Sequence, residues 1–280
     1  MRTAVIGASG LLGKYLMREL NDPEILGFSS REVDIRDAAQ VMQVIDLARP
    51  EWVVLAAAYT DVDGCETNQG LAFDTNTRGA LNVAEAAKRV GAKLLFLSSD
   101  YIFDGTNTTP YETTAPRNPR SVYGRSKAQA EIGIAEILPQ ACIVRTSWVF
   151  GIQGKCFPDT ILQLTQTRSE LEVVDDQHGS PTYARDLARA IDQLCRANAK
   201  GIVHVTNRGE CTWFEFAREI VRESKLKTTV RPTTTDKFPR PAERPKYSVL
   251  SGKSLDQYSV RMPAWQDALK AYLAERESSQ

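Results

Sequence analysis

Short apolar runs alternate with stretches of helical spacing through the first 150 residues of the chain. The apolar runs predict buried strands over 3–6, 24–28, 52–58, 93–97 and 142–145. Apolar residues recurring every three or four positions predict helices over 11–20, 37–48, 77–90 and 122–137. The strands are apolar throughout, which is typical of a parallel sheet with helices on both faces. We therefore predict an α/β fold built on a doubly wound parallel sheet.

The pattern is looser beyond about residue 150. Helices are predicted over 212–223 and 265–276, and the segment 227–246, rich in Thr, Pro and basic residues, is predicted to be loop. We expect residues 1–150 to form one domain, which regains a segment near 180–205. Residues 151–280 are expected to form mainly a second, smaller domain.

Composition narrows the possible partners. The 280 residues carry 35 basic and 35 acidic side chains, so the net charge is zero and a polyanion-binding surface is not expected. The five cysteines are isolated in the sequence and only two histidines accompany them, so we predict reduced thiols and no metal site. No apolar run has the length of a membrane span or a signal peptide. We expect a cytoplasmic protein without nucleic-acid or membrane partners.

A glycine-rich turn joins the first predicted strand to the first predicted helix. Its sequence is Gly7-Ala8-Ser9-Gly10-Leu11-Leu12-Gly13. Glycines let a pyrophosphate approach the backbone closely, and the helix N-terminus attracts its negative charge. The turn therefore predicts a Rossmann-type dinucleotide-binding domain over residues 1–150, leaving 151–280 for the substrate.

The end of the second strand should contact the adenosine ribose. Ser29, Ser30 and Arg31 stand there, in place of the acidic residue that favours NAD. Two hydroxyls and a guanidinium suit a 2′-phosphate, so we predict NADPH as the cofactor, with NADH as the alternative.

Two further groups of residues carry candidate chemistry. Tyr123 and Lys127 are four residues apart at the start of a predicted helix and share one of its faces. A phenol can donate a proton to a ketone oxygen, and we predict that the nearby ammonium lowers its pKa. Ser98 and Ser99 end a predicted strand, at the sheet edge where ligands bind, and Ser99 can polarise a substrate carbonyl.

These residues resemble extended short-chain dehydrogenases and, more narrowly, the dTDP-4-dehydrorhamnose reductase family. The resemblance covers nearly the whole chain, and its more specific segments come late. They are Arg145 to Gly151, Asp176 to Tyr183, Cys211 to Ala217 and Arg240 to Pro245.

The resemblance implies that NADPH reduces the C4 ketone of dTDP-4-dehydro-β-L-rhamnose, with Tyr123 as proton donor. Lys127 would tune Tyr123 and bind the cofactor, and Ser99 stands where the family usually has threonine. Further cofactor contacts are implied for Asp34, Ile35, Ala56, Ala57, Ala58 and Ser98. Contacts with the sugar nucleotide are implied for Ser99, Asp100 and Trp148.

The neutral net charge means that positive charge for the sugar nucleotide's diphosphate must be placed locally. We predict this role for the basic residues of the C-terminal loop, with Arg240 and Arg244 foremost. The others are Arg231, Lys237 and Lys246.

One position departs from the resemblance. Some family members hold Mg²⁺ at a dimer interface through glutamates, one of them two positions after the last glycine of the turn. Tyr15 stands there in this chain. A carboxylate-bound Mg²⁺ is therefore not expected, and both a monomer and a homodimer remain open.

Two alternatives also remain open. Another nucleotide-sugar reductase or an epimerase would share the glycine turn, Ser99, Tyr123 and Lys127. A non-catalytic regulatory subunit would bind nucleotide and a partner enzyme, but it would have no need of the proton donor.

Overall fold

A computed structural model describes residues 1–152 and 154–278 of the chain. Its helices are α1 (Leu11–Glu19), α2 (Ala38–Ala48), α3 (Val62–Thr67), α4 (Gln69–Phe73), α5 (Ala80–Val90), α6 (Val122–Ile137), α7 (Phe157–Leu164), α8 (Ala184–Arg196), α9 (Trp213–Glu223) and α10 (Trp265–Ser278). Its strands are β1 (Thr3–Ile6), β2 (Leu26–Phe28), β3 (Trp52–Leu55), β4 (Lys93–Ser99), β5 (Cys142–Thr146), β6 (Val149–Phe150), β7 (Glu170–Val174), β8 (His178–Gly179), β9 (Thr182–Tyr183), β10 (Gly201–His204), β11 (Cys211–Thr212) and β12 (Thr229–Thr233). A π-helical turn, η1 (Asp74–Gly79), leads into α5, and short 3₁₀ turns cover Asp100–Ile102 (η2), Thr235–Lys237 (η3) and Gly252–Tyr258 (η4).

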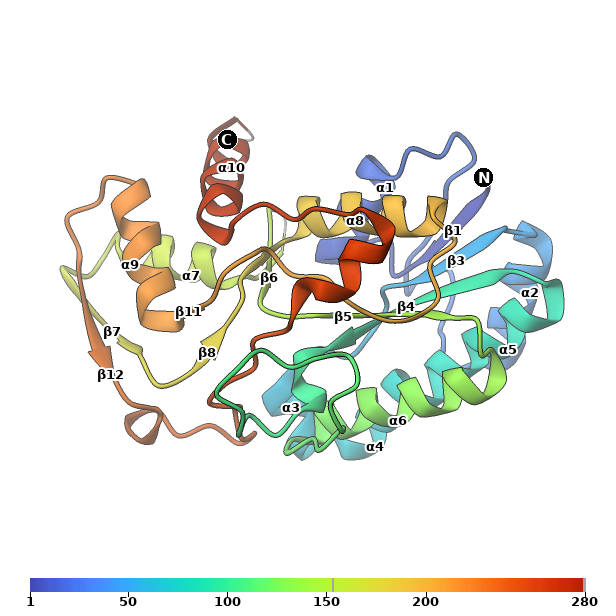
Figure 1. The fold of residues 1–280 in the computed structure, drawn as a ribbon, viewed down its shortest axis with the longest axis horizontal. Helices are drawn as coiled ribbons and strands as arrows, with labels where there is room; N and C mark the ends of the chain where they lie inside the picture. The colour runs from blue at the N-terminus through green and yellow to red at the C-terminus, as the bar shows by residue number, and fades with distance from the viewer. Residues whose placement is uncertain (153, 279–280) are drawn as a thin grey trace.

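A six-stranded sheet with strand order β10-β5-β4-β3-β1-β2 forms the centre of the molecule (Figure 1). Every pairing in it is parallel, as the apolar strands predict. The chain leaves β1 for β2 on one side and then crosses to β3 on the other. Parallel α/β sheets bind ligands at the carboxyl ends of the strands beside such a switch point.

Helices cover both faces of this sheet, so the predicted doubly wound α/β fold is confirmed. One apolar core packs α1 and α8 against one face, and a second packs α2, α5 and α6 against the other (Figure 1). Strand residues alternate between the two cores: Val54 lies in the first and Val53 in the second. Both faces of each strand must therefore be apolar, which explains the continuous apolar runs.

Residues beyond 150 contribute to both parts of the molecule. Strand β10 pairs with β5 at one edge of the central sheet, and α8 packs against α1. Strand β12 pairs with β7 at the far end of the molecule, where α9 lies beside α7, whereas η4 lies beside β10 (Figure 1). The division into two domains by function stays a prediction.

Several predicted elements need correction. Segment 227–246 is not all loop, because its residues 229–233 form β12; this exposed strand contains Pro232 and lacks an apolar pattern. The strand predicted over 52–58 ends at Leu55, since the amides of Ala56 and Ala57 both turn to the carbonyl of Ile6. The helix predicted over 77–90 begins as the π-helical turn η1.

All five cysteines are buried and unpaired. Within the described part of the chain, no helix has the length and apolar character needed to cross a membrane.

Candidate active site

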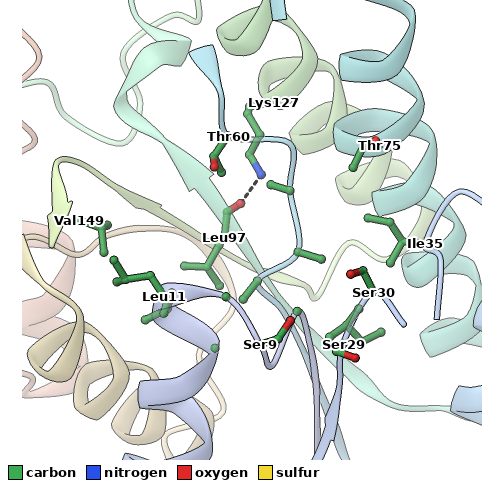
Figure 2. Close-up of a pocket in the computed structure, with 18 of the residues that line it drawn as sticks. Ser9, Leu11, Ser29, Ser30, Ile35, Thr60, Thr75, Leu97, Lys127 and Val149 are labelled. Atoms are coloured by element: carbon green, nitrogen blue, oxygen red, sulfur yellow. Dashed lines mark hydrogen bonds between the residues drawn. The ribbon is translucent and has the colours of Figure 1, made fainter. Parts of the chain in front are cut away.

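A cavity of about 670 Å³ opens at the carboxyl ends of the central strands, beside the switch point (Figure 2). It brings together most of the residues predicted to hold the cofactor. These are Gly7, Gly10, Leu11, Leu12, Gly13, Asp34, Ile35, Ala56, Ala57, Ala58, Ser98, Tyr123 and Lys127. The residues predicted to bind the sugar nucleotide do not line it.

The glycine turn forms one wall of this cavity. Gly7 has a positive φ of 96°, and a Cβ there would lie 2.6 Å from the amide nitrogen of Ala57. A Cβ on Gly13 would enter the backbone of Gly7 and Ala8. Gly10 caps α1 without a side-chain hydrogen bond, so the amides of the first helical turn remain available to a ligand. This backbone fits a pyrophosphate, which needs close approach and free N–H donors.

A second wall is polar and follows β2. Ser29 and Ser30 line the cavity, but Arg31 is exposed and does not. The backbone turns back at this point, because Glu32 and Val33 both donate to the carbonyl of Ser29. Arg31 does not line this cavity, and its contact with the cofactor stays a prediction.

The guanidinium that does line this wall belongs to Arg36. It makes an ion pair with Asp34, with 2.6 Å between Arg36 Nη2 and Asp34 Oδ2. The pKa of Asp34 is lowered by these hydrogen bonds from Arg36. Asp34 thus holds the Arg36 guanidinium on the cavity that Ser29 and Ser30 also line.

Tyr123 and Lys127 lie on one face of α6, which Ser121 caps by accepting a hydrogen bond from the amide of Gly124. Lys127 is 2% exposed, and its Nζ donates to the carbonyl of Leu97 at 2.5 Å (Figure 2). The same Nζ lies 4.1 Å from the centroid of the Phe96 ring. Lys127 is therefore held against β4, at the edge of the cavity.

Burial shifts the pKa values of both Lys127 and Tyr123. It lowers the pKa of Lys127 to about 7, although the charge of Glu131 opposes this shift. Burial also raises the pKa of Tyr123, which a hydrogen bond with Ser99 only partly offsets. The net pKa of the Tyr123 phenol is therefore raised, and a lowering of this pKa by Lys127 stays a prediction. The desolvation of the phenol outweighs the hydrogen bond.

Ser99 and Asp100 continue this chain of polar groups at the end of β4. Ser99 Oγ donates to Asp100 Oδ1 at 2.9 Å, and Tyr101 N donates to Ser99 Oγ at 3.2 Å. Asp100 is 1% exposed, and burial raises its pKa to about 6. The Ser99 hydroxyl lies between the Tyr123 phenol and the Asp100 carboxyl group, so it can donate to one of them and accept from the other.

Trp148 follows β5 and has an unusual backbone. Its φ of 47° is in the left-handed region, which is costly for a bulky residue. Its ring stacks on Trp213 with 3.5 Å between centroids and 9° between planes. The two half-buried indoles form an aromatic surface in the C-terminal part.

The five predicted cations do not form one cluster. Arg244 pairs with Asp63 at 2.9 Å and acts electrostatically on Tyr101, whose ring packs edge-on against Tyr123. Arg240 also acts on Asp63. Arg231 instead pairs with Glu170 at 2.6 Å on the β7–β12 pair. Lys237 is exposed in η3, and Lys246 acts on Asp176. The structure thus associates only Arg240 and Arg244 with the Tyr123 end of the site.

Sequence reasoning missed some cavity residues besides Arg36. Thr60 and Thr75 line the cavity (Figure 2). Lys155 lines it as well. Thr60 follows β3, and Thr75 lies in η1 after α3 and α4. Their position after a buried strand was a usable signal. Lys155 comes from a loop far along the chain, and no local pattern marks it.

The residues around Tyr15 do not fit a carboxylate-bound Mg²⁺. Tyr15 donates to Glu275 at 2.7 Å, and the same carboxylate accepts from Arg18 at 2.7 Å and Arg185 at 2.8 Å. Tyr183 also donates to it. Cations and hydroxyls already surround this carboxylate, and the described residues contain no group of three potential metal ligands.

A profile described as RmlD substrate binding domain matches residues 1–278. The chain belongs to this RmlD family. The match extends over the glycine turn, the Tyr123–Lys127 pair and the C-terminal elements alike.

Relatives of this RmlD-family chain are similar over nearly their full length. The spore coat polysaccharide biosynthesis protein SpsK of Bacillus subtilis is 39% identical over 280 residues, covering 99% of each chain. The dTDP-4-dehydrorhamnose reductase of Mycobacterium tuberculosis is 37% identical over 288 residues, covering 99% of this chain and 94% of that protein. A solved structure of dTDP-4-dehydrorhamnose reductase from Bacillus anthracis in complex with NADP has a TM-score of 0.95 and 40% identity, covering 98% of this chain and 99% of that one.

Proposed function

We propose that this chain uses NADPH to reduce the C4 ketone of dTDP-4-dehydro-β-L-rhamnose to dTDP-β-L-rhamnose. The observation that carries the proposal is the Tyr123 phenol. It is hydrogen-bonded to Ser99 and one helical turn from Lys127, at a cavity that a glycine turn bounds. The named reductases among the relatives support the choice of substrate.

The cofactor supplies the hydride when it is bound. The backbone of the glycine turn would hold the pyrophosphate, and Ala56 to Ala58 would run along the ribose. Ser30 and Arg36 would receive the 2′-phosphate, because a hydroxyl and a guanidinium suit that group. Ser29 donates its hydroxyl proton to Glu32 at 2.8 Å. Ser30 and Arg36 favour NADPH over NADH.

Tyr123 would donate its proton to the developing alkoxide at C4. A phenol with a raised pKa keeps its proton until a negative charge forms beside it, so it acts as the acid. Ser99 would donate a second hydrogen bond to the same oxygen once its hydroxyl proton turns from Asp100 to the substrate. Lys127 would stabilise the phenolate that remains.

The sugar nucleotide would lie beyond Tyr123, toward the C-terminal part. Asp100 would contact sugar hydroxyls, and Trp148 would pack against the sugar or base. Arg240 and Arg244 would face the diphosphate, since they are the cations associated with the Tyr101–Tyr123 end of the site.

Identifying the product tests this proposal. The protein is incubated with NADPH and dTDP-4-dehydro-β-L-rhamnose, and the product is compared with authentic dTDP-β-L-rhamnose by chromatography and NMR. In parallel, kcat/KM is measured for NADPH and NADH. NADPH consumption with the expected C4 epimer supports the proposal. A different C4 epimer would place the chain among other nucleotide-sugar reductases, and binding without turnover would indicate a regulatory subunit.

We also propose a cytoplasmic location, since all five cysteines are unpaired, as expected in a reducing compartment. The chain is proposed to act as a monomer or homodimer without bound Mg²⁺. Sedimentation analysis with and without a chelator tests both points.

A further inference from the structure

We propose that Glu131 is a positioning residue for the reduction. Its buried carboxylate, on the same helix α6, favours the charged form of Lys127 and sets the direction of the Ser98 hydrogen bond. The proposal rests on the proposed function for its relevance to catalysis. Its test, however, needs only the binding of NADPH.

Glu131 continues the face of α6 that carries Tyr123 and Lys127, one helical turn beyond the lysine. It is fully buried. Its Oε1 accepts from Ser98 Oγ at 2.5 Å and Arg145 Nε at 2.9 Å. Its Oε2 accepts from Arg145 Nη2 at 2.7 Å and Arg117 Nε at 2.6 Å. Four hydrogen bonds from three segments of the chain therefore fix this carboxylate.

Glu131 is charged in spite of its burial. Burial by itself raises its pKa, but the hydrogen bonds and charges of Arg145 and the bonds from Ser98 and Arg117 lower the net pKa below the usual value. A permanent negative charge therefore lies inside the protein behind Lys127. Arg145 is 1% exposed and balances this charge from β5.

Other titratable groups lie on the elements packed against α6 or bind Glu131. They are Tyr123 on α6, Cys65 on α3, Asp100 and Tyr101 on η2, Arg145 on β5 and Arg117 in the loop before α6, with His204 on β10 in contact with Arg145. Among all of these and Glu131, the charge of Glu131 is the one that favours the protonated form of Lys127 against burial. Without it, Lys127 would lose its proton at lower pH.

Glu131 also determines what Ser98 offers to the cavity. A serine hydroxyl has one proton, and that of Ser98 is donated to Glu131. Because Ser98 lines the cavity, it can only accept hydrogen bonds there. The Glu131 carboxylate thus favours a charged Lys127 and leaves the Ser98 hydroxyl as an acceptor, and both side chains line the same cavity.

A purely structural role for Glu131 makes a different prediction. A buried ion pair can simply tie α6 to β5, and breaking it would then weaken the fold without moving any titration. Arg117 separates the two roles, because it contacts the same carboxylate and its side chain is 29% exposed. Removing this positive charge should act on Lys127 in the opposite direction from removing Glu131.

The experiment measures the Kd of NADPH by fluorescence titration from pH 5 to pH 10. Affinity for the anionic cofactor should fall as Lys127 loses its proton, and Lys127→Met should abolish that step, which assigns it. Glu131→Gln should move the midpoint about one pH unit lower, as expected for a unit charge one helical turn away. Arg117→Gln should move it higher. Glu136→Gln, an exposed glutamate on the same helix, should leave it in place.

Opposite shifts for Glu131→Gln and Arg117→Gln support the proposal. An unchanged midpoint in Glu131→Gln, or shifts of both variants in one direction, would overturn it. If Glu131→Gln does not fold, Arg117→Gln decides alone: a higher midpoint supports the proposal and an unchanged one rejects it. If the chain binds NADPH but does not reduce the named sugar, the proposed function fails while this test still stands.

Discussion

His204 should make the stability of this protein depend on pH between 7 and 5. It lies at the end of β10, 1% exposed, with Nε2 at 3.4 Å from Nη1 of Arg145. Because a guanidinium only donates, Nε2 must accept, and the ring is held neutral. Burial, helped by the charge of Arg145, lowers the pKa of His204 from 6.5 to about 4.

The pKa of His204 differs between the unfolded and the folded chain, and this difference sets the direction of the stability change with pH. The unfolded chain binds the proton near pH 6.5 and the folded chain only near pH 4. The contribution to stability is therefore complete above pH 6.5 and is lost as the pH falls toward 4. Between pH 7 and pH 5, this amounts to a loss of about 2 kcal/mol in the free energy of unfolding.

Asp100 acts in the opposite direction over the same range. Its folded pKa of about 6 is above the ordinary value of 3.8, so folding is favoured at low pH and this contribution is lost as the pH rises through 6. When the pH falls from 7 to 5, Asp100 adds about 1 kcal/mol to the free energy of unfolding. The contributions of His204 and Asp100 therefore partly cancel in the wild type.

Urea unfolding at pH 7 and pH 5 measures both contributions. The stability difference between His204→Gln and the wild type should move by about 2 kcal/mol in favour of the variant at pH 5. For Asp100→Asn it should move by about 1 kcal/mol the other way. His178→Gln, which removes the other histidine, is measured alongside. A difference between His204→Gln and the wild type that is the same at both pH values would refute the reasoning.

Three further changes probe the site. Tyr123→Phe should retain NADPH binding and lower kcat by about 10²- to 10⁴-fold, the usual contribution of a general acid, and turnover near the wild-type rate would remove Tyr123 from the mechanism. Gly13→Ala should weaken NADPH binding and cost about 1–3 kcal/mol of stability in urea unfolding, because its Cβ enters the backbone of the turn; Gly70→Ala, where the space is open, should not. Arg244→Ala should raise KM for the sugar nucleotide with little change in NADPH affinity, whereas Arg231→Ala on the β7–β12 pair should not. Equal effects of the two arginine variants in steady-state kinetics would contradict the assignment of the diphosphate site.

The features that local sequence determines were predicted best. The helix over 122–137 has the predicted bounds, because Ser121 caps it and its apolar residues pack into the second apolar core. The glycine turn lies where the first strand meets the first helix, because its glycines serve close backbone contacts. The parallel sheet follows from strands that are buried on both faces.

The features that depend on three-dimensional context were missed. Arg31 and Arg36 both follow the second predicted strand, and the sequence does not distinguish their roles. Only the backbone turn after Ser29 decides which of the two lines the cavity. The pKa of Tyr123 depends on how deeply the phenol is buried, which its spacing from Lys127 does not reveal. The partners of Glu131 come from segments far apart in the chain, so no local motif marks them.

The contacts of Glu275 also bear on the order in which the molecule can be completed during synthesis. Its carboxylate joins α10 to Tyr15 and Arg18 on α1, the helix that opens the cofactor site. A ribosome produces α1 some 260 residues before Glu275. The nascent chain must therefore hold α1, with the Tyr15 hydroxyl lacking this partner, until α10 has emerged. The NADPH site should mature late, and a chain stalled before α10 should expose a loosened site to proteases or chaperones.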